Sequence, residues 1–156
     1  MEKPDFVKVD LEKDEHQKAL LNLMDMYMQD EMGTGRSMPK QLESKIIEGL
    51  KNHPAYLGFF VRLGNEYAAL ANCNLNFSTW QAKPLINIHD FVVSPDYRQK
   101  GIGQFLLKEI EKYAVKTGCC RINLEVRHDN VKAQNLYRKV GFTECEPPNY
   151  FWEKRW

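Results

Sequence analysis

Apolar and polar positions along the chain repeat with two periods, and the change of period separates strands from helices. Alternation over a few residues, or a short apolar run, predicts a strand. Apolar residues three and four positions apart predict one buried face of a helix. The strands predicted in this way cover residues 6–9, 56–63, 66–77, 85–93 and 121–126, with a closing pair over 142–146 and 150–156. The predicted helices cover residues 14–32, 39–51 and 104–117, and a last helix opens at Asp129 or Asn130.

Turn residues support these boundaries. Gly64-Asn65 is typical of a two-residue hairpin, Pro54 disfavours helix in the residue before it, and Gly118 is suited to end a helix. The element order is strand, two helices, three strands, helix, strand, helix, two strands. This order predicts an α/β (α+β) domain with a single mixed sheet and flanking helices.

Composition limits the classes of protein that fit. A chain of 156 residues with 43% hydrophobic content predicts one domain, residues 1–156, with an ordinary core. The formal net charge of +1 argues against a dedicated nucleic-acid binder. No apolar stretch is long enough to span a membrane and no secretory signal opens the chain, so we expect a cytoplasmic protein.

The four cysteines show no Cys-x-x-Cys spacing, and no group of His, Cys and carboxylate residues has metal-ligand spacing. We therefore expect no metal site and four reduced, mostly buried thiols, which are Cys73, Cys119, Cys120 and Cys145.

The segment that carries chemistry is Arg98-Gln99-Lys100-Gly101-Ile102-Gly103, between a predicted strand and a predicted helix. A glycine turn at a helix N-terminus presents backbone N–H groups and a partial positive charge to a phosphate. The turn matches neither the P-loop pattern nor the three-glycine dinucleotide fingerprint. On these residues alone, a tight strand-to-helix connection without a ligand is an equal alternative.

Residues 92–107 resemble the acetyl-CoA-binding core of the GCN5-related N-acetyltransferases, and residues 130–142 resemble a second segment of that family, Asn-x-x-Ala-x-x-Leu/Phe-Tyr-x-x-x-Gly-Phe. The resemblance implies the acyl-CoA N-acyltransferase fold, a mostly antiparallel sheet whose central parallel strands splay apart to admit acetyl-CoA. The residues that it implies for binding the cofactor are Phe91, Val92, Val93, Arg98, Gln99, Lys100, Gly101, Ile102, Gly103, Gln104, Asn130, Ala133 and Tyr137.

Two residues are candidates for proton transfer. The resemblance places Tyr137 where many family members carry the tyrosine that protonates the coenzyme A sulfur, although a tyrosine at helical spacing also suits a core position. It places His89 where arylalkylamine-type members carry a histidine that accepts the proton of the substrate ammonium. An imidazole titrates near neutral pH, so it suits this role, but a strand histidine satisfied by a neighbour is an equal alternative.

Residues 88–93 and 77–84 also resemble the diamine (spermidine/spermine-type) branch of the family, which implies a homodimer. His89 replaces the glutamate of that branch, and Gln99 replaces a common glycine. Asp90 could orient an ammonium group, or simply stabilise the next turn. Asp25, Asp30 and Glu31 could form an acidic wall for a cationic acceptor, or simply a solvated helix face.

The expected function is acetyl-CoA-dependent transfer of an acetyl group to a primary amine of a small molecule, polyamine-like or another cationic amine. The transfer is expected to be direct, in a ternary complex. An aminoglycoside, an amino acid or a protein N-terminus are alternative acceptors, and a non-catalytic acyl-CoA-binding module is an alternative of another class.

Overall fold

The structure is a computed structural model that covers residues 1–156. It divides into two compact units, Met1–Glu125 and Val126–Trp156. The first unit contains, in order, β1 (Asp5–Lys8), α1 (Asp14–Gln29), α2 (Lys40–Lys51), β2 (Tyr56–Leu63), β3 (Glu66–Ser78), β4 (Lys83–Val93), the short 3-10 helix η1 (Pro95–Tyr97), α3 (Ile102–Lys116) and β5 (Ile122–Leu124). The second contains α4 (Val131–Lys139).

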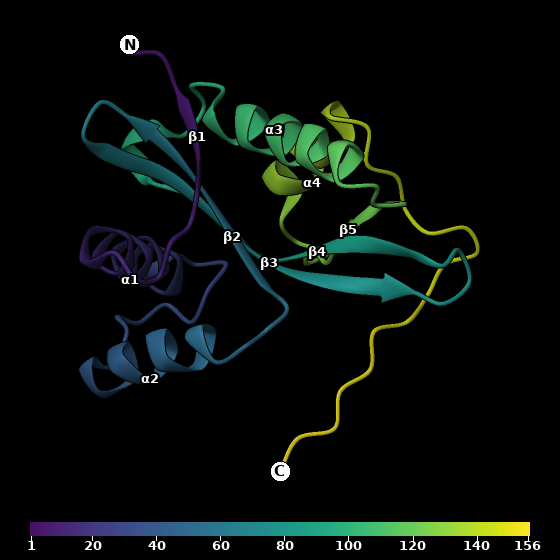
Figure 1. Cartoon of the computed structure of the whole chain (residues 1–156), viewed down its shortest axis with the longest axis horizontal. Helices are drawn as coiled ribbons and strands as arrows, with labels where there is room; N and C mark the ends of the chain where they lie inside the picture. The colour runs from purple at the N-terminus through teal and green to yellow at the C-terminus, as the bar shows by residue number, and fades with distance from the viewer. The chain divides into compact units, whose positions relative to one another are not determined.

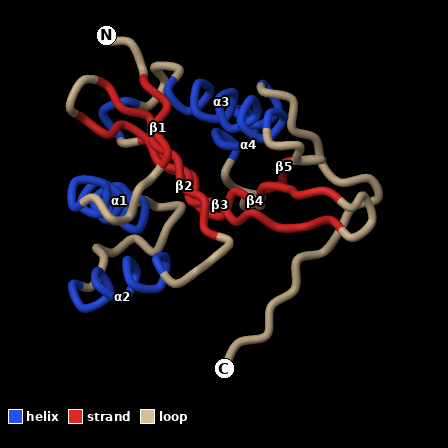
Figure 2. The backbone as a smooth tube through the Cα atoms, in the orientation of Figure 1, coloured by secondary structure: helices blue, strands red, loops and turns tan.

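The strands form one mixed sheet in the order β1-β2-β3-β4-β5. The first four strands pair antiparallel, and β5 alone is parallel to its neighbour β4. The predicted mixed, mostly antiparallel sheet is therefore confirmed. The Gly64-Asn65 hairpin joins β2 to β3, with Gly64 in the left-handed region at φ 56°, and β3 and β4 form the longest paired segment (Figure 2).

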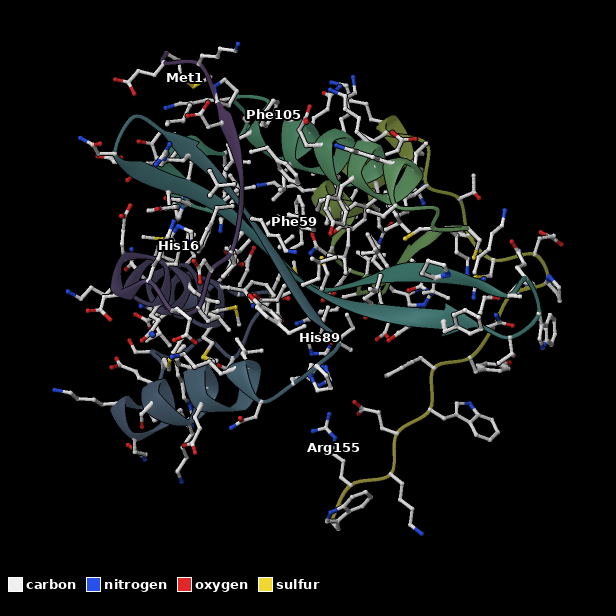
Figure 3. The ribbon with its side chains drawn as sticks, in the orientation of Figure 1. Met1, His16, Phe59, His89, Phe105 and Arg155 are labelled. Atoms are coloured by element: carbon white, nitrogen blue, oxygen red, sulfur yellow. The ribbon has the colours of Figure 1, made fainter.

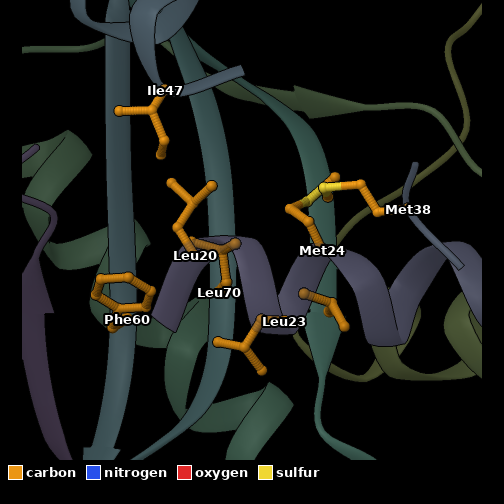
Figure 4. Close-up of a cluster of buried hydrophobic side chains, with 8 residues drawn as sticks. Leu20, Leu23, Met24, Met38, Ile47, Phe60 and Leu70 are labelled. Carbon is orange, nitrogen blue, oxygen red and sulfur yellow. The ribbon is translucent and has the colours of Figure 1, made fainter. Parts of the chain in front are cut away.

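Helices α1 and α2 lie on one side of the sheet and α3 lies on the other (Figure 1). The alternation of side chains along a strand divides the apolar residues between these two sides. On the α1 side, Figure 4 shows a buried cluster from both helices and three strands. Its members are Leu20, Leu23, Met24, Met38, Ile47, Phe60, Leu70 and Val92.

The α3 side of the sheet has its own buried layer. Phe59, the neighbour of Phe60, points to this side and contacts the ring of Tyr113 on α3 at a centroid distance of 4.9 Å. The predicted apolar stripe of α3 is buried throughout, at Ile102, Leu106, Leu107, Ile110 and Ala114. Helix α3 ends as predicted, because Gly118 takes φ 78° and its N–H donates to Val115 C=O.

The two parallel strands separate as the resemblance implied. Pairing between β4 and β5 covers Ile86 to Ile88 on β4 and ends where Ile88 meets Leu124. Strand β4 continues to Val93, still paired with β3, but β5 has already ended. On the β5 side, the last five residues of β4 therefore have no strand opposite them.

In the second unit, the chain after α4 contains neither helix nor strand (Figure 2). The predicted strand pair over residues 142–146 and 150–156 is wrong. The two segments would have formed an isolated two-stranded hairpin, which is marginally stable.

Three other predictions need correction. Helix α1 ends at Gln29 rather than at residue 32, because Asp30 is extended (φ −64°, ψ 152°) and its carboxylate accepts the Met32 N–H at 3.0 Å. Strand β5 is shorter than residues 121–126, because its pairing stops at Leu124. The four cysteines are free, but Cys73 alone is buried. No helix of the chain has the length and apolar character needed to cross a membrane.

Candidate active site

The glycine turn leaves β4 through η1 and enters α3 with two residues in the left-handed region. Gln99 has φ 59° and Gly101, the N-cap of α3, has φ 81°. A left-handed backbone costs roughly 1–2 kcal/mol for a residue with a side chain and little for glycine. The backbone therefore favours glycine at both positions, and Gln99 adopts this conformation despite its side chain.

The N-terminus of α3 offers backbone donors. Its first intrahelical hydrogen bond runs from the Phe105 N–H to the Gly101 C=O at 2.9 Å. The N–H groups of Ile102, Gly103 and Gln104 consequently have no acceptor within the helix. No side chain caps them. Together with the helix dipole, they can bind an anionic group such as a phosphate.

The two basic side chains of the turn have partners within the first unit. Arg98 Nε donates to Val93 C=O at 3.1 Å, and Arg98 Nη2 lies 2.9 Å from Asp30 Oδ2. Lys100 Nζ donates to Asp96 C=O at 2.7 Å and lies 5.6 Å from the centroid of the Tyr97 ring. Both cations lie close to the turn and contribute positive charge beside the helix N-terminus.

The end of β4 supplies the backbone expected for a cofactor arm. Val92 is buried against the α1 side of the sheet, while Phe91 and Val93 are half-buried. Because β5 ends opposite Ile88, this stretch has an edge on which an amide-containing ligand can pair. The strand leads directly through Ser94 into the glycine turn.

His89 lies at the point where β4 and β5 separate (Figure 3). It is the extra residue of a β-bulge, since Asn72 pairs with Asp90 and Cys73 pairs with Ile88. Its side chain is exposed. The side-chain hydrogen bonds of the structure do not include one to the imidazole, and the proton-transfer role of His89 stays a prediction.

Asp90 is half-buried and belongs to a hydrogen-bonded group that the sequence analysis missed. Asn72 Nδ2 donates to Asp90 Oδ2 at 3.0 Å, and Tyr56 Oη donates to Asn72 Oδ1 at 2.9 Å. Burial, followed by the charges of Cys73 and Asp90, raises the pKa of Tyr56, which therefore keeps its proton. The signal available in the sequence was a lone asparagine inside the apolar run 68–73.

The three carboxylates of the expected acidic wall have different surroundings. Asp25 accepts the Met38 N–H at 2.6 Å and the side-chain amide of Gln29 at 2.8 Å, which fastens α1 to the segment before α2. Asp30 pairs with Arg98 of the glycine turn. Glu31 is exposed. Asp25 and Asp30 thus already serve as structural contacts.

The second unit holds the remaining candidates on α4. Asn130 is the N-cap of this helix, and its Oδ1 accepts the Ala133 N–H at 3.2 Å, so the helix opens at one of its two predicted positions. Tyr137 is 8% exposed, and its ring lies 5.8 Å from that of Phe142. The Tyr137 C=O accepts the Phe142 N–H at 3.0 Å, which fixes the turn that follows α4.

Comparison with known proteins gives a family model and several relatives. The model for the acetyltransferase (GNAT) family matches residues 20–142. A thialysine N-epsilon-acetyltransferase from Bos taurus is 35% identical over 74 residues, 46% of this chain and 43% of the relative. A streptothricin acetyltransferase from Streptomyces lavendulae is 30% identical over 98 residues, 63% of this chain and 51% of the relative. The chain spans about half the length of these curated relatives or less.

Solved structures agree with the fold. A probable acetyltransferase superposes with a TM-score of 0.83 at 21% identity, covering 97% of this chain and 98% of the other. An aminoglycoside acetyltransferase from an uncultured soil metagenomic sample, in complex with sisomicin, gives a TM-score of 0.80 at 16% identity, over 97% and 96% of the two chains. At such identities these structures support the fold and leave the substrate open.

Proposed function

The chain belongs to the acetyltransferase (GNAT) family, and from this membership we propose that it is an acetyl-CoA-dependent N-acetyltransferase for a small cationic amine. The observation that carries the proposal is the continuity of β4 with the glycine turn. The end of β4 that β5 does not reach, a left-handed glycine and the N–H groups at the N-terminus of α3 follow one another within a short stretch of chain. This order suits a ligand with an amide-containing arm and a pyrophosphate.

The donor groups fit coenzyme A chemistry. In the proposal, the N–H groups of Ile102, Gly103 and Gln104 bind the pyrophosphate. Gln99, Lys100 and Gly101 contribute the rest of the turn, and Arg98 adds charge. The backbone of Phe91, Val92 and Val93 pairs with the pantetheine arm. The resemblance also assigns Asn130, the N-cap of α4, and Ala133 and Tyr137 on that helix to cofactor binding.

Acetyl-CoA supplies an activated acetyl thioester, and the chain supplies proton transfer and orientation. His89 accepts the proton that an acceptor ammonium must lose before its nitrogen can attack. Tyr137 donates a proton to the departing sulfur. Asp90 holds a positively charged group of the acceptor, while Asp25, Asp30 and Glu31 add negative charge on the acceptor side.

The names of two relatives support an amine acceptor, since both are acetyltransferases, one acting on the N-epsilon position of thialysine and the other on streptothricin. The proposal includes direct transfer in a ternary complex, a single domain over residues 1–156, a homodimer and a cytoplasmic location. The homodimer follows the resemblance to the diamine branch, and the cytoplasmic location follows the cysteine usage.

The test is incubation of the purified chain with acetyl-CoA and each member of an amine panel, followed by mass spectrometry. The panel contains spermidine, putrescine, thialysine, arylalkylamines, aminoglycosides, amino acids and short peptides. We expect one acetyl group on a nitrogen of a polyamine-like or other cationic amine. Tight binding of acetyl-CoA without acetylation of any amine would instead identify a non-catalytic acyl-CoA-binding module.

A further inference from the structure

A line of hydrogen-bonded side chains crosses three strands on the α1 side of the sheet. Tyr56 is on β2, Asn72 is on β3 and Asp90 is on β4. Asn72 is the register partner of Asp90 on one side and of Gly58 on the other. Asn72 Nδ2 also lies 3.4 Å from Met24 Sδ of α1, so the line runs on the side that α1 covers.

The backbone of β2 is adapted to this line. Tyr56 and Gly58 are two residues apart and therefore point to the same face. A Cβ atom on Gly58 would lie 2.2 Å from Tyr56 Oη and 2.7 Å from Val9 Cγ2, distances that real Cβ atoms do not show. The absence of a side chain at Gly58 is what allows the tyrosine hydroxyl to reach Asn72.

The direction of each hydrogen bond follows from the chemistry of the groups. A carboxylate accepts only, so the Asn72 amide must present its Nδ2 to Asp90. The same amide must then present its Oδ1 to Tyr56, whose hydroxyl donates. The carboxylate thereby determines which way round the amide lies, and the hydroxyl, by donating to Oδ1, holds the amide against one oxygen of Asp90.

Folding alone does not require this arrangement. Asn72 is only 6% exposed and lies between apolar neighbours on β3, and a buried polar side chain is costly unless its hydrogen bonds are satisfied. A leucine, whose side chain has the same number of heavy atoms and the same branching, would bury more apolar surface at this position. The line ends at Asp90 Oδ2, next to the exposed His89, while Asp90 Oδ1 is left for another ligand.

Resting on the proposed function, we propose that Tyr56 and Asn72 are positioning residues that orient the Asp90 carboxylate to bind a second cationic group of the acceptor. The acceptor class is then a diamine or polyamine in which one nitrogen is acetylated and another stays protonated. Neither residue touches the reacting atoms, so their effect falls on acceptor binding.

The test is Tyr56→Phe, which removes the hydroxyl and keeps the ring. We expect the KM for a diamine to rise about fivefold, as suits a weakened hydrogen bond to a charged group, with kcat changed less than about twofold. The KM for a monoamine of the same length and the Kd for acetyl-CoA should stay unchanged. In an Asp90→Asn background, Tyr56→Phe should have no further effect on the diamine KM, because the group that it orients has lost its charge.

Tyr67→Phe is the matched control, since Tyr67 lies on the same sheet and its Oη donates to Glu15 of α1 at 2.5 Å, without contact to Asp90. Asn72→Leu serves as a second variant and should reproduce the rise in diamine KM. If Tyr56→Phe and Asn72→Leu both lower the melting temperature and leave the diamine KM unchanged, the positioning role is wrong. The hydrogen bonds between these side chains would then serve stability alone.

The wild-type assay separates this result from failure of the proposed function. Turnover of a diamine by the wild type with unaltered KM in the variants contradicts the positioning role alone. If the wild type acetylates no amine, the proposed function fails. In that case, calorimetry measures the affinity of the coenzyme A-loaded protein for spermidine, in the wild type and in the same variants, as the test of Asp90. Equal spermidine affinities of the wild type and the variants would overturn the positioning role as well.

Discussion

The Arg98 guanidinium and the Asp30 carboxylate form an ion pair, with Nη2 2.9 Å from Oδ2. The pair joins the glycine turn to the residue that ends α1. Arg98 is also held by its Nε bond to Val93 C=O. We propose that Arg98 adds charge near the pyrophosphate and that Asp30 lies on the acceptor side. The ion pair therefore joins a residue of the proposed cofactor site to a residue of the proposed acceptor site.

This relationship predicts that Asp30 competes with the cofactor for Arg98. In Asp30→Asn the competing charge is lost, and we expect acetyl-CoA to bind about two- to fivefold more tightly, within the range of a partly exposed ion pair. Calorimetric titration at two salt concentrations measures the effect, which should shrink at high salt. Asp5→Asn, which breaks the exposed pair of Asp5 with Arg62, is the control. Weaker binding in Asp30→Asn would mean that Asp30 holds Arg98 in its binding position.

The two ends of α3 offer a matched test of the phosphate turn. Gly101 and Gly118 both have left-handed φ angles, 81° and 78°, and a Cβ on either would meet nothing within 4 Å. We expect Gly101→Glu to abolish acetyl-CoA binding, because its carboxylate would repel the pyrophosphate. Gly118→Glu carries the same backbone strain and should cost stability alone. Equal acetyl-CoA affinities of the two variants in a direct binding assay would exclude the turn as the phosphate site.

The parts of the fold that depend on local pattern were predictable. The β2–β3 hairpin, the apolar stripe of α3 and the Gly118 end of that helix each follow from residues close together in the chain. The family segments likewise located the glycine turn and α4. The same reasoning placed strands near the C-terminus that the structure lacks, since a strand needs a partner that local pattern does not specify.

The contacts that the sequence did not reveal depend on strand register. Tyr56, Asn72 and Asp90 are far apart in the chain, and a shift of one residue would move any of them to the other face. The Arg98–Asp30 pair similarly depends on where α1 ends, and the predicted helix ran past that residue. A lone asparagine in an apolar strand marked a buried polar contact without identifying its partners.

Tyr137 provides the test of proton donation to sulfur. Tyr137→Phe keeps the ring that packs beside Phe142, so we expect the α4 unit to stay folded. The kcat should fall about 100-fold, while the Kd for acetyl-CoA changes little. Tyr150→Phe is the control, because Tyr150 is 90% exposed in the same unit. Unchanged turnover in Tyr137→Phe would assign Tyr137 to packing.

The role proposed for His89 predicts a pH-dependent loss. Without the imidazole, the ammonium proton must leave unaided, so His89→Ala should lower kcat/KM strongly at neutral pH. The loss should shrink at alkaline pH, where more of the amine is already neutral. His53→Ala, which removes an exposed histidine bonded to Asn74, should follow the wild-type profile. A loss of equal size at every pH would make His89 a structural residue.

His16 on α1 predicts a pH dependence of stability (Figure 3). Its Nδ1 accepts the Asp10 N–H at 2.8 Å, and burial, followed by the nearby Lys13 charge, lowers its pKa below 6.5. In the unfolded chain His16 binds a proton more readily, so its stabilising contribution is complete above pH 6.5 and is lost as the pH falls below it. Urea unfolding should show a decline no steeper than about 1.4 kcal/mol per pH unit from this residue.

His16→Asn is the variant that isolates this effect, because asparagine can accept the Asp10 N–H and does not titrate in this range. As the pH is lowered from 6.5, the free energy of unfolding of His16→Asn should fall less than that of the wild type. An identical pH profile of the two proteins would show that His16 does not control acid stability.

The central claim is direct transfer of an acetyl group from acetyl-CoA to a cationic amine held on the same protein. The most direct measurement is the initial rate of thiol release with both substrates varied, using the amine that the panel identifies. Direct transfer predicts lines that intersect in double-reciprocal plots, with no release in the absence of amine. Parallel lines, which indicate an acetylated enzyme, or thiol release that no amine accelerates, would contradict the claim.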